Sequence, residues 1–408
     1  MNGNWAYNWV QIMSHNKVPL IGTWGVLSMV CIYGLSALDF TGMMSSMLLL
    51  GMGLGLMSIT VSILLDSVKT LFIQLWLSLY VLAMTFGVLG WLGVALTENT
   101  VLGLVVLMTL MTSNLVHILS TLLRGMARGG FQYDAVPESI HLNNGPILLS
   151  NLTTALGFIF VGWYDAQLMD LAIVVSVGVT ISYLTTLTWL PMLLLNWLLE
   201  FRVGNGKDRH GFSFVAKWLI AHPGLRAMLL WTALILSAVL TYYSWMNMAD
   251  LVEELMWLAG SFIVLFILFW KSIKLALINV IVNLLALLLT VNVFILVLGL
   301  DSISLLLLMI PLGLIVDDGI HFFSRYLRAQ QSLFSETDSA VRFAMASVGR
   351  PIWITSWVLL IGLMMLLLSD SQLVQQASII AMVALVIATA LILLIVPAVL
   401  IALNQKKA

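Results

Sequence analysis

Residues 313–326 read GLIVDDGIHFFSRY and place two adjacent carboxylates, Asp317 and Asp318, in the middle of a long apolar stretch. A run of this length and composition is typical of a helix that crosses a bilayer. Insertion scales assign a cost of about 2.5 to 3.5 kcal/mol to one aspartate at the centre of such a helix. Carboxylates are therefore rare inside membranes and usually belong to an ion pathway or a proton relay, so we predict that this pair is the functional centre.

The composition of the whole chain excludes a soluble or a disordered protein. Of the 408 residues, 62% are hydrophobic and 9% are charged, and the mean hydropathy is +1.09. These values predict an all-α polytopic membrane protein in contact with the lipid bilayer. The sequence contains no basic stretch typical of nucleic-acid binding, no phosphate-binding loop and no nucleophile–base arrangement. We therefore expect neither a nucleic-acid partner nor an enzyme.

Twelve apolar runs each approach the ~20 residues that a spanning helix needs. The runs lie near 18–38, 43–64, 71–93, 101–123, 147–163, 169–197, 226–246, 252–270, 275–298, 303–325, 351–368 and 374–402. The predicted parts of the chain are an N-terminal segment at 1–17, a first six-helix repeat at 18–199, a cytoplasmic linker at 200–225, a second six-helix repeat at 226–403 and a tail at 404–408. In the second run, Gly51, Gly53 and Gly55 predict close helix packing.

The basic residues are distributed unevenly around these runs. Every Lys and Arg falls on one side, whereas the loops on the other side carry only acidic residues among the charged types. Because an excess of Lys and Arg marks cytoplasmic loops, that side is predicted to be the cytoplasm. An even number of spans then places both termini in the cytoplasm. Segments 124–146 and 326–350, which follow the fourth and tenth runs, are predicted to be equivalent cytoplasmic segments, and the second is amphipathic.

The two halves of the chain repeat at an offset of 205 residues. The segment DSVK at 66–69 matches KSIK at 271–274, and GPI at 145–147 matches RPI at 350–352. Because each half has an even number of spans, the repeat is parallel, with its axis along the membrane normal. Parallel repeats are typical of transporters, although a duplicated scaffold without transport would show the same pattern.

The acidic pair has a histidine close by. Asp317 and His321 are four residues apart and share a helix face, whereas Asp318 is turned away by about 100°. At an offset of 204, the equivalents of Asp317, Asp318 and His321 are Ser113, Asn114 and His117 in the fourth span. The repeat axis therefore predicts that His117 and His321 lie near each other and that Asp317 faces Ser113. No set of side chains resembles the complete ligands of a metal site, so we expect no bound metal.

Small polar side chains lie on the adjoining spans. They are Ser150, Asn151, Thr153 and Thr154 in the fifth span, and Thr355 and Ser356 in the eleventh. Hydroxyls of this kind can solvate a buried carboxylate or pass a proton to it. Because burial disfavours an ionised carboxylate, an aspartate here can load a proton from one side and release it to the other. In the alternative interpretation, Asp317 stays protonated and only forms hydrogen bonds to neighbouring helices.

The motifs of the second half resemble a known family. The string VDDGIHFFSRY, the GRPIWITS that begins the eleventh span and the later LLLSD are similar to the resistance-nodulation-division (RND) superfamily, in particular to MMPL-type and predicted lipid exporters. This resemblance implies two six-helix repeats in a bacterial inner membrane and a proton relay on an acid of the fourth or tenth span. Carried over to this chain, it implies that Asp317 is the relay acid, with Asp318 at a position often held by Tyr and with Thr355 or Ser356 as the neighbouring hydroxyl. The proton gradient replaces a bound cofactor, and sodium remains an alternative ion.

The chain departs from the family in two respects. The family has large periplasmic porter domains after the first and seventh spans, which bind and move the substrate. Here the intervals from Leu38 to Met43 and from Met246 to Leu251 are only a few residues long. The acid of the fourth span is replaced by Ser113 and Asn114, so the implied relay depends on the tenth span.

Three functions agree with this pattern. In the first, the chain converts proton flow into motion for periplasmic or membrane partner proteins that handle a lipid or another hydrophobic substrate. In the second, it is an autonomous proton-coupled exporter or lipid flippase. In the third, it is a scaffold or sensor that does not transport, similar to the sterol-sensing use of these helices. Asp250, Glu253 and Glu254 form an acidic patch that is predicted either to dock a partner or to belong to a solvated loop.

Overall fold

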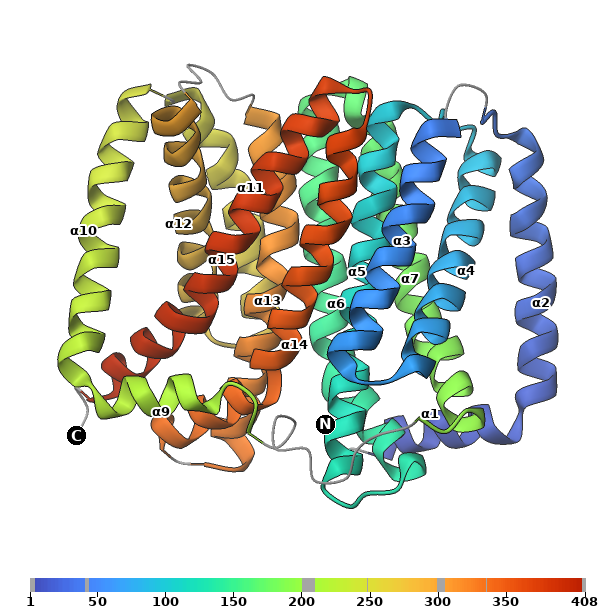
Figure 1. Ribbon diagram of the computed structural model, residues 1–408, viewed down its shortest axis with the longest axis horizontal. Helices are drawn as coiled ribbons and strands as arrows, with labels where there is room; N and C mark the ends of the chain where they lie inside the picture. The colour runs from blue at the N-terminus through green and yellow to red at the C-terminus, as the bar shows by residue number, and fades with distance from the viewer. Residues whose placement is uncertain are drawn as a thin grey trace. The chain divides into compact units, whose positions relative to one another are not determined.

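All of the regular structure in the described part of the chain is helical (Figure 1). The computed structural model describes residues 4–40, 44–199, 210–247, 249–298, 305–334 and 336–405. Within these ranges, 9 helices are long and apolar enough to cross a membrane, or 10 if the bent pair near residue 222 is one span. The predicted all-α membrane fold is confirmed, whereas the number of twelve spans stays a prediction.

The chain forms two compact units. Unit 1 contains Met1–Arg209 and Trp357–Ser378, and unit 2 contains His210–Ser356 and Ile379–Ala408. The first boundary falls within the predicted linker at 200–225, of which residues 200–209 lie outside the described ranges. The predicted division into two repeats at this linker stays a prediction.

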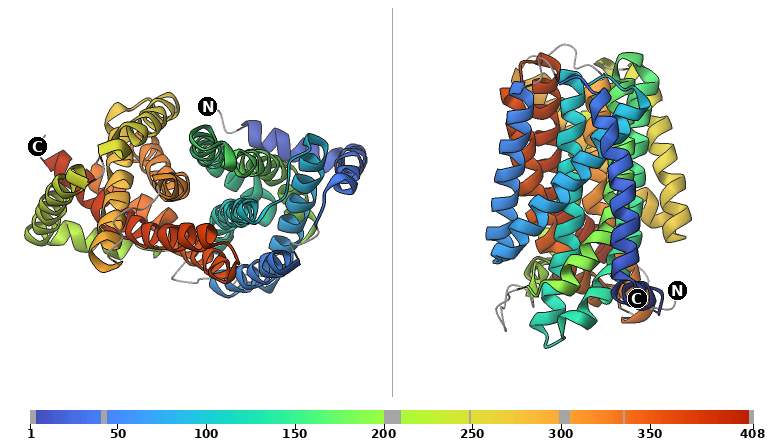
Figure 2. Two further views of the ribbon diagram at one scale, coloured as in Figure 1. Left: turned by 90° about the horizontal axis from the view of Figure 1, so that it is seen from above. Right: turned by 90° about the vertical axis from the view of Figure 1, so that its right-hand side faces the viewer.

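Each unit is built mainly from long helices, which Figure 2 (left) shows nearly end-on. Unit 1 contains α1 (Asn4–His15), α2 (Lys17–Tyr33), α3 (Met44–Leu65), α4 (Val68–Leu92), α5 (Glu98–Ala127), α6 (Gln132–Tyr164) and α7 (Met169–Asn196), with the short 3-10 helices η1 (Gly34–Ala37) and η2 (Ala166–Leu168). Unit 2 contains α9 (Ser213–Ala221), α10 (Pro223–Asn247), α11 (Ala249–Trp270), α12 (Ile273–Leu298) and α13 (Leu305–Ser332). Residues of α14 (Thr337–Met365) and α15 (Gln372–Gln405) belong to both units, and η3 (Leu366–Leu368) belongs to unit 1.

The backbone repeats where the sequence motif repeats. Asp66 and Lys271, which are 205 residues apart, have positive φ angles of 56° and 53°. A positive φ is uncommon for residues other than glycine, so its occurrence at both positions indicates the same turn. After this turn, α4 begins at Val68 and α12 begins at Ile273, again at the same offset.

The core of unit 1 is organised around α5. This helix is buried from Thr100 to Leu119 and contacts α3, α6 and α7. By contrast, α2 has no buried residue and contacts α4. The amphipathic α1 packs on α6 and α7, and the Trp9 Nε1 donates a hydrogen bond of 3.0 Å to the Leu187 carbonyl. The buried α5 therefore holds Ser113, Asn114 and His117 in the interior.

The predicted close packing at the glycines of α3 is only partly correct. A Cβ atom added at Gly51 or Gly55 would meet nothing within 4 Å, and one added at Gly53 would lie 3.3 Å from the Met365 Cγ. Glycines two residues apart point in different directions around a helix, so the series does not form one smooth face. The tight glycine contact lies elsewhere. It is formed by α4 on one side and by α2 and η1 on the other.

The amphipathic segment predicted at 326–350 consists mainly of the end of one long helix and the start of the next. The helix α13 continues to Ser332, and α14 begins again at Thr337. Val341, Ala344 and Val348 are buried within this helical hairpin, so the amphipathic pattern reflects helix packing.

Glu98 holds the start of α5 to two other elements of unit 1. The Ser46 Oγ lies 2.8 Å and 2.9 Å from the two carboxylate oxygens, and the Ser369 Oγ donates a bond of 3.4 Å to Oε2. A carboxylate near a helix N-terminus is also stabilised by the helix dipole. We expect Glu98→Gln to lower the free energy of unfolding by about 1 kcal/mol. Thermal unfolding in detergent measures this effect, with the exposed Glu138 changed to Gln as the control; equal melting temperatures for the two variants would contradict it.

Candidate functional site

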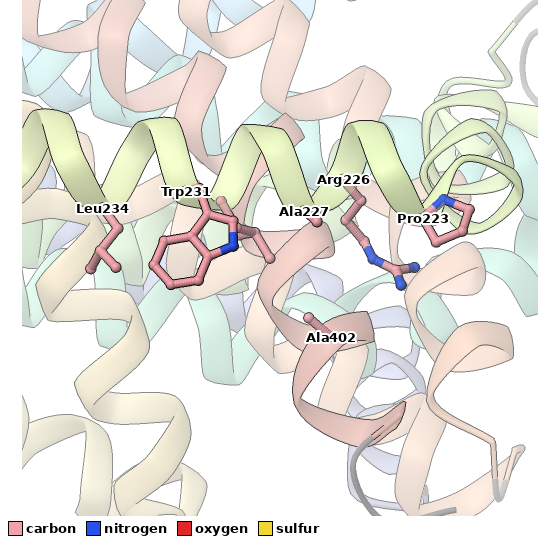
Figure 3. Close-up of a pocket in the computed structure, with 7 residues that line it drawn as sticks. Pro223, Arg226, Ala227, Trp231, Leu234 and Ala402 are labelled. Carbon is pink, nitrogen blue, oxygen red and sulfur yellow. The ribbon is translucent and has the colours of Figure 1, made fainter.

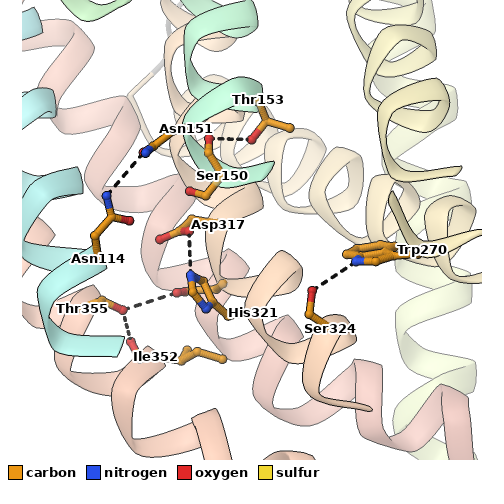
Figure 4. Close-up of polar contacts among 11 residues, drawn as sticks. Asn114, Ser150, Asn151, Thr153, Trp270, Asp317, His321, Ser324, Ile352 and Thr355 are labelled. Carbon is orange, nitrogen blue, oxygen red and sulfur yellow. Dashed lines mark hydrogen bonds and ion pairs between the residues drawn. The ribbon is translucent and has the colours of Figure 1, made fainter. Parts of the chain in front are cut away.

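The acidic pair lies inside unit 2, on α13. Asp317 is 6% exposed, Asp318 is 5% exposed and His321 is fully buried. The indole Nε1 of Trp270 on α11 donates a hydrogen bond of 3.1 Å to the Ser324 Oγ (Figure 4). The Trp270 ring lies 5.5 Å from the Phe323 ring. These contacts hold α13 against α11 between one and two turns beyond the acids.

One face of α13 carries a column of ionisable side chains. The His321 Nε2 lies 3.5 Å from the Asp317 Oδ1, which confirms the prediction that they share a face (Figure 4). Arg325 follows one further turn along the same face and is only 5% exposed. The sequence interpretation placed Arg325 at the cytoplasmic end of the span and gave it no role. The four-residue spacing of Asp317, His321 and Arg325 is the signal that would have identified it.

Asp318 points to a group of hydroxyls on α14 and α15. The Thr355 Oγ1 donates to the Asp318 Oδ1 over 3.4 Å, and the Thr389 Oγ1 donates to Oδ2 over 3.2 Å. The Ser356 and Thr389 hydroxyl oxygens are 2.8 Å apart. The resemblance implies that Thr355 or Ser356 lies beside Asp317. In the structure, Thr355 donates to Asp318, and Ser356 contacts Thr389, which also donates to Asp318. The cause is the turn of about 100° between consecutive helix residues, which directs the two carboxylates to different neighbours.

The hydroxyl of Thr355 has two acceptors within reach. Besides the contact with Asp318, the Thr355 Oγ1 lies 2.9 Å from the Ile352 carbonyl oxygen of its own helix (Figure 4). A hydroxyl carries one proton and can also accept, so it donates to one of these two oxygens at a time. Ser356 likewise lies 2.8 Å from the Ile352 carbonyl. The hydroxyls can thus change partners as the carboxylate gains or loses a proton.

Thr389 is a site residue that the sequence interpretation missed. It is the one threonine in the apolar run 374–402, where hydropathy gives it no weight. Its equivalent at the 204 offset is Thr185, which is fully buried in α7. This is the same offset that relates the acidic pair to Ser113 and Asn114, so the repeat contained the signal.

In unit 1, the equivalent positions hold amides. The Asn114 Nδ2 on α5 lies 3.5 Å from the Asn151 Oδ1 on α6, and Thr153 donates to the Ser150 carbonyl over 2.9 Å (Figure 4). Thr154 on α6 is also buried. Ser113 and His117 are buried on the same α5 helix. Amides do not exchange protons as carboxylates do, so this set is polar but cannot carry a proton on its own acid.

Two further predictions about these residues remain untested. The proximity of His117 to His321, and of Ser113 to Asp317, concerns residues of two units that are each described by themselves. Asp250, Glu253 and Glu254 lie in the first turns of α11, and their side chains are outside the described part of the chain.

The chemistry of the Asp318 group suits a proton or a hard cation. The Asp318 carboxylate and the hydroxyls of Thr355, Ser356 and Thr389 are buried and in contact with one another, and oxygen ligands are those that hard cations prefer. The same groups can hold and pass a proton, because each hydroxyl both donates and accepts. The site therefore supports ion binding, and both alternatives from the sequence remain open.

A groove in unit 2 lies away from the acidic pair, along α10 and the end of α15 (Figure 3). Its volume is about 520 Å³. The lining residues are Pro223, Arg226, Ala227, Leu230, Trp231, Leu234 and Ala402. The Nη1 of the buried Arg226 donates to the Leu219 carbonyl over 3.4 Å at the corner where α9 and α10 meet at 100°. The groove thus combines an apolar wall with one cationic end.

Known proteins share this fold. The profile of the MMPL family matches residues 221–407. A crystal structure of SecDF in its super-membrane-facing form aligns with a TM-score of 0.71 and 13% identity over 89% of this chain and 63% of that one. A crystal structure of SecDF from Thermus thermophilus, described as a translocon-associated membrane protein, aligns with a TM-score of 0.72 and 14% identity over 89% of this chain and 62% of that one.

These matches define what is shared. Among curated proteins, none matches the sequence. The chain spans less than two thirds of the length of either SecDF chain, and identities of 13% and 14% establish a common RND-like transmembrane fold only. The MMPL family match covers residues 221–407, somewhat less than half of the chain, and over these residues it confirms the resemblance that the sequence motifs show.

Proposed function

We propose that the chain couples the proton-motive force to membrane transport and that Asp318 is the group that loads and releases the proton. The observation that carries this proposal is the buried Asp318 carboxylate, which accepts hydrogen bonds from Thr355 and Thr389 on two other helices. An intramembrane carboxylate is costly, and a hydroxyl shell that can change partners gives it a chemical use. Asp317 and His321 form the adjoining polar contact.

The proposed cycle follows from the geometry of the hydroxyls. When Asp318 is ionised, Thr355 and Thr389 donate to its two oxygens. When Asp318 is protonated, it needs fewer donors, and Thr355 donates to the Ile352 carbonyl instead. The change in protonation thus loosens the contact of α13 with α14 and α15, which is the two-state element that a transport cycle requires. A membrane potential supplies about 2.3 kcal/mol per elementary charge per 100 mV to drive it.

We further propose that this motion energises separate periplasmic or membrane proteins that move a lipid or other hydrophobic substrate. The short intervals after the first and seventh predicted spans leave no room there for porter domains. The fold likeness to SecDF, one structure of which is described as translocon-associated, supports a role beside other proteins. The basic residues support a bacterial inner-membrane location with both termini in the cytoplasm. The chain is proposed to have no enzymatic activity.

A second candidate function is an autonomous exporter or lipid flippase. The groove along α10 favours it, because Leu230, Trp231 and Leu234 provide an apolar wall and Arg226 provides a cation that suits a lipid phosphate. A third candidate, a scaffold or sensor, needs neither partner-driven transport nor a titrating aspartate. The two transport functions both require Asp318, whereas only the first requires a stable partner.

Affinity purification tests the first function. The chain is isolated from its native membrane in a mild detergent, and the proteins that accompany it are quantified by mass spectrometry. We expect companions in a fixed ratio to the chain, and an unrelated polytopic membrane protein with the same tag serves as the control. A chain that purifies alone would contradict the energising role and favour the exporter.

A further inference from the structure

The third long helix of each half, α4 in the first and α12 in the second, carries polar residues in the same register. Gln74 and Ser78 on α4 match Asn279 and Asn283 on α12 at the offset of 205. Gln74 and Asn279 are 0% exposed, and Ser78 and Asn283 are 1% exposed. Within each pair the residues are four apart, so they share one helix face. The two helices therefore bury equivalent polar pairs.

In unit 2, the hydrogen bonds fix how the two amides are oriented. The Asn283 Nδ2 donates to the Asn279 backbone carbonyl over 2.8 Å and to the Asn279 Oδ1 over 3.2 Å. A flipped Asn283 would place its oxygen against that carbonyl, so the network selects the orientation. Among the described residues, the Asn279 Nδ2 and the Asn283 Oδ1 have no hydrogen-bond partner. One buried donor and one buried acceptor thus remain.

In unit 1, a different set of hydrogen bonds also leaves buried polar atoms without a partner among the described residues. The Gln74 Nε2 donates to the Thr112 Oγ1 over 2.9 Å, and that hydroxyl donates to the Met108 carbonyl over 2.8 Å. The Gln74 amide is therefore oriented with its nitrogen toward Thr112. Its Oε1 and the Ser78 Oγ make no hydrogen bond to any described residue. An acceptor and a hydroxyl remain on one face of α4.

The chemistry of these atoms identifies what fits them. A cation would require acceptors and would be repelled by the Asn279 amide hydrogens, and an anion would be repelled by the Asn283 oxygen. A lipid chain could satisfy neither atom. Water donates and accepts, and buried water typically binds to buried polar groups that protein atoms leave unsatisfied. We propose that Asn279 with Asn283, and Gln74 with Ser78, are two equivalent internal water sites.

The site in unit 2 adjoins the relay helix. A Cβ atom added at Gly319 would collide with the Asn279 Oδ1, so glycine at this position is what lets the amide reach α13. Gly319 directly follows Asp318 in the sequence. The water would bring a proton carrier to the segment of α13 that holds the Asp318 carboxylate. This role in proton transfer rests on the proposed function.

A structure of the full chain in lipid nanodiscs, at a resolution that reveals ordered water, tests the two sites directly. We expect a water at about 3 Å from both the Asn279 Nδ2 and the Asn283 Oδ1, and another beside the Gln74 Oε1 and Ser78 Oγ. Amides that are satisfied by protein atoms alone, with no water, would overturn the inference. The result does not depend on ion transport, so it stands apart from the test of the proposed function.

Proton uptake by proteoliposomes tests the role of the unit 2 water. We expect Asn279→Ala to slow uptake about tenfold, as the loss of a hydrogen-bonded bridge predicts. Thr290→Val is the matched control on the same helix, because the buried Thr290 hydroxyl donates to the Ala286 carbonyl over 2.8 Å and leaves nothing for water to complete. Equal rates for wild type, Asn279→Ala and Thr290→Val would overturn that role.

A double variant separates hydration from packing. Gly319→Ala is expected to destabilise the protein through the collision with Asn279, and Gly319→Ala/Asn279→Ala is expected to recover the melting temperature but not the uptake rate. Recovery of both would overturn the role of the water and leave the amide a packing function. If the wild type shows no proton uptake, the proposed function fails, whereas the ordered waters would still be expected.

Discussion

Asp318→Asn is expected to abolish proton uptake by proteoliposomes that contain the chain, with a loss of about 100-fold or more in the initial rate. The amide has nearly the same shape as the carboxylate and still accepts from Thr355, so the fold is retained. It cannot bind and release a proton, and its nitrogen replaces the oxygen that accepts from Thr389. A pH-sensitive dye inside the vesicles measures the rate after a potential is imposed.

Two other aspartates make this experiment decisive. Asp317→Asn is expected to reduce uptake less, because the Thr355 and Thr389 hydroxyls donate to Asp318, whereas Asp317 lies against His321. Asp370→Asn, which changes an exposed acid, is expected to leave the rate unchanged. Loss in Asp317→Asn with activity retained in Asp318→Asn would identify Asp317 as the relay acid, as the family resemblance implies. Full uptake in both variants would exclude both aspartates as the relay acid, and no uptake in the wild type would favour the scaffold. Transport of sodium without proton uptake would identify sodium as the coupling ion.

The sequence was sufficient to select the candidate residues on α13 but not to assign their contacts. Two carboxylates in an apolar run have few explanations, so the site on α13 follows from hydropathy alone. Which hydroxyl meets which carboxylate depends on how α13 is rotated against α14 and α15, and that rotation is set by side-chain packing between helices. Helix period relates Asp317 to His321 but carries no information about Thr355 or Thr389.

The missed residues share one physical cause. Thr389, Asn279 and Asn283 are polar residues within strongly apolar helices, and a hydropathy average over a span hides them. Threonine is also well tolerated in apolar helices, because its hydroxyl can bond to the preceding turn. Comparison of the two halves at offsets of 204 and 205 would have revealed these positions. A polar residue that recurs at the equivalent position of both halves indicates a shared role, whereas one that occurs in a single half does not.

The glycines show that helix contacts, too, are hard to predict from the sequence. Gly51, Gly53 and Gly55 attract notice as a series, yet neighbours two apart lie on different sides of a helix. Gly87 and Gly90 are three apart and share a face, which is the spacing that brings helix backbones together. Only the structure shows that this face of α4 meets α2 and η1.

Gly87→Ala is expected to destabilise unit 1 by about 3 kcal/mol, an effect near the upper end for overpacked cores. A Cβ atom at Gly87 would collide with the carbonyl oxygen of Cys31, and one at Gly90 would collide with that of Gly34. Both obstacles are backbone atoms, which cannot move aside as a flexible side chain can. Although α2 has no buried residue, this glycine contact lets it approach α4 closely, beside the hydrogen bond of 2.9 Å that the Trp91 Nε1 donates to the Val30 carbonyl.

Gly51→Ala on α3 is the matched control, because its Cβ would meet nothing within 4 Å. Alanine favours a helix over glycine by up to about 1 kcal/mol, so this variant is expected to raise the melting temperature in detergent. The two substitutions are chemically identical and both lie within long helices, yet the expected shifts have opposite signs. The difference between them measures the α2–α4 contact without the contribution of helix propensity. A rise in both variants would mean that α2 can separate from α4 at little cost, and the close approach of Gly34, Gly87 and Gly90 would then not stabilise the fold.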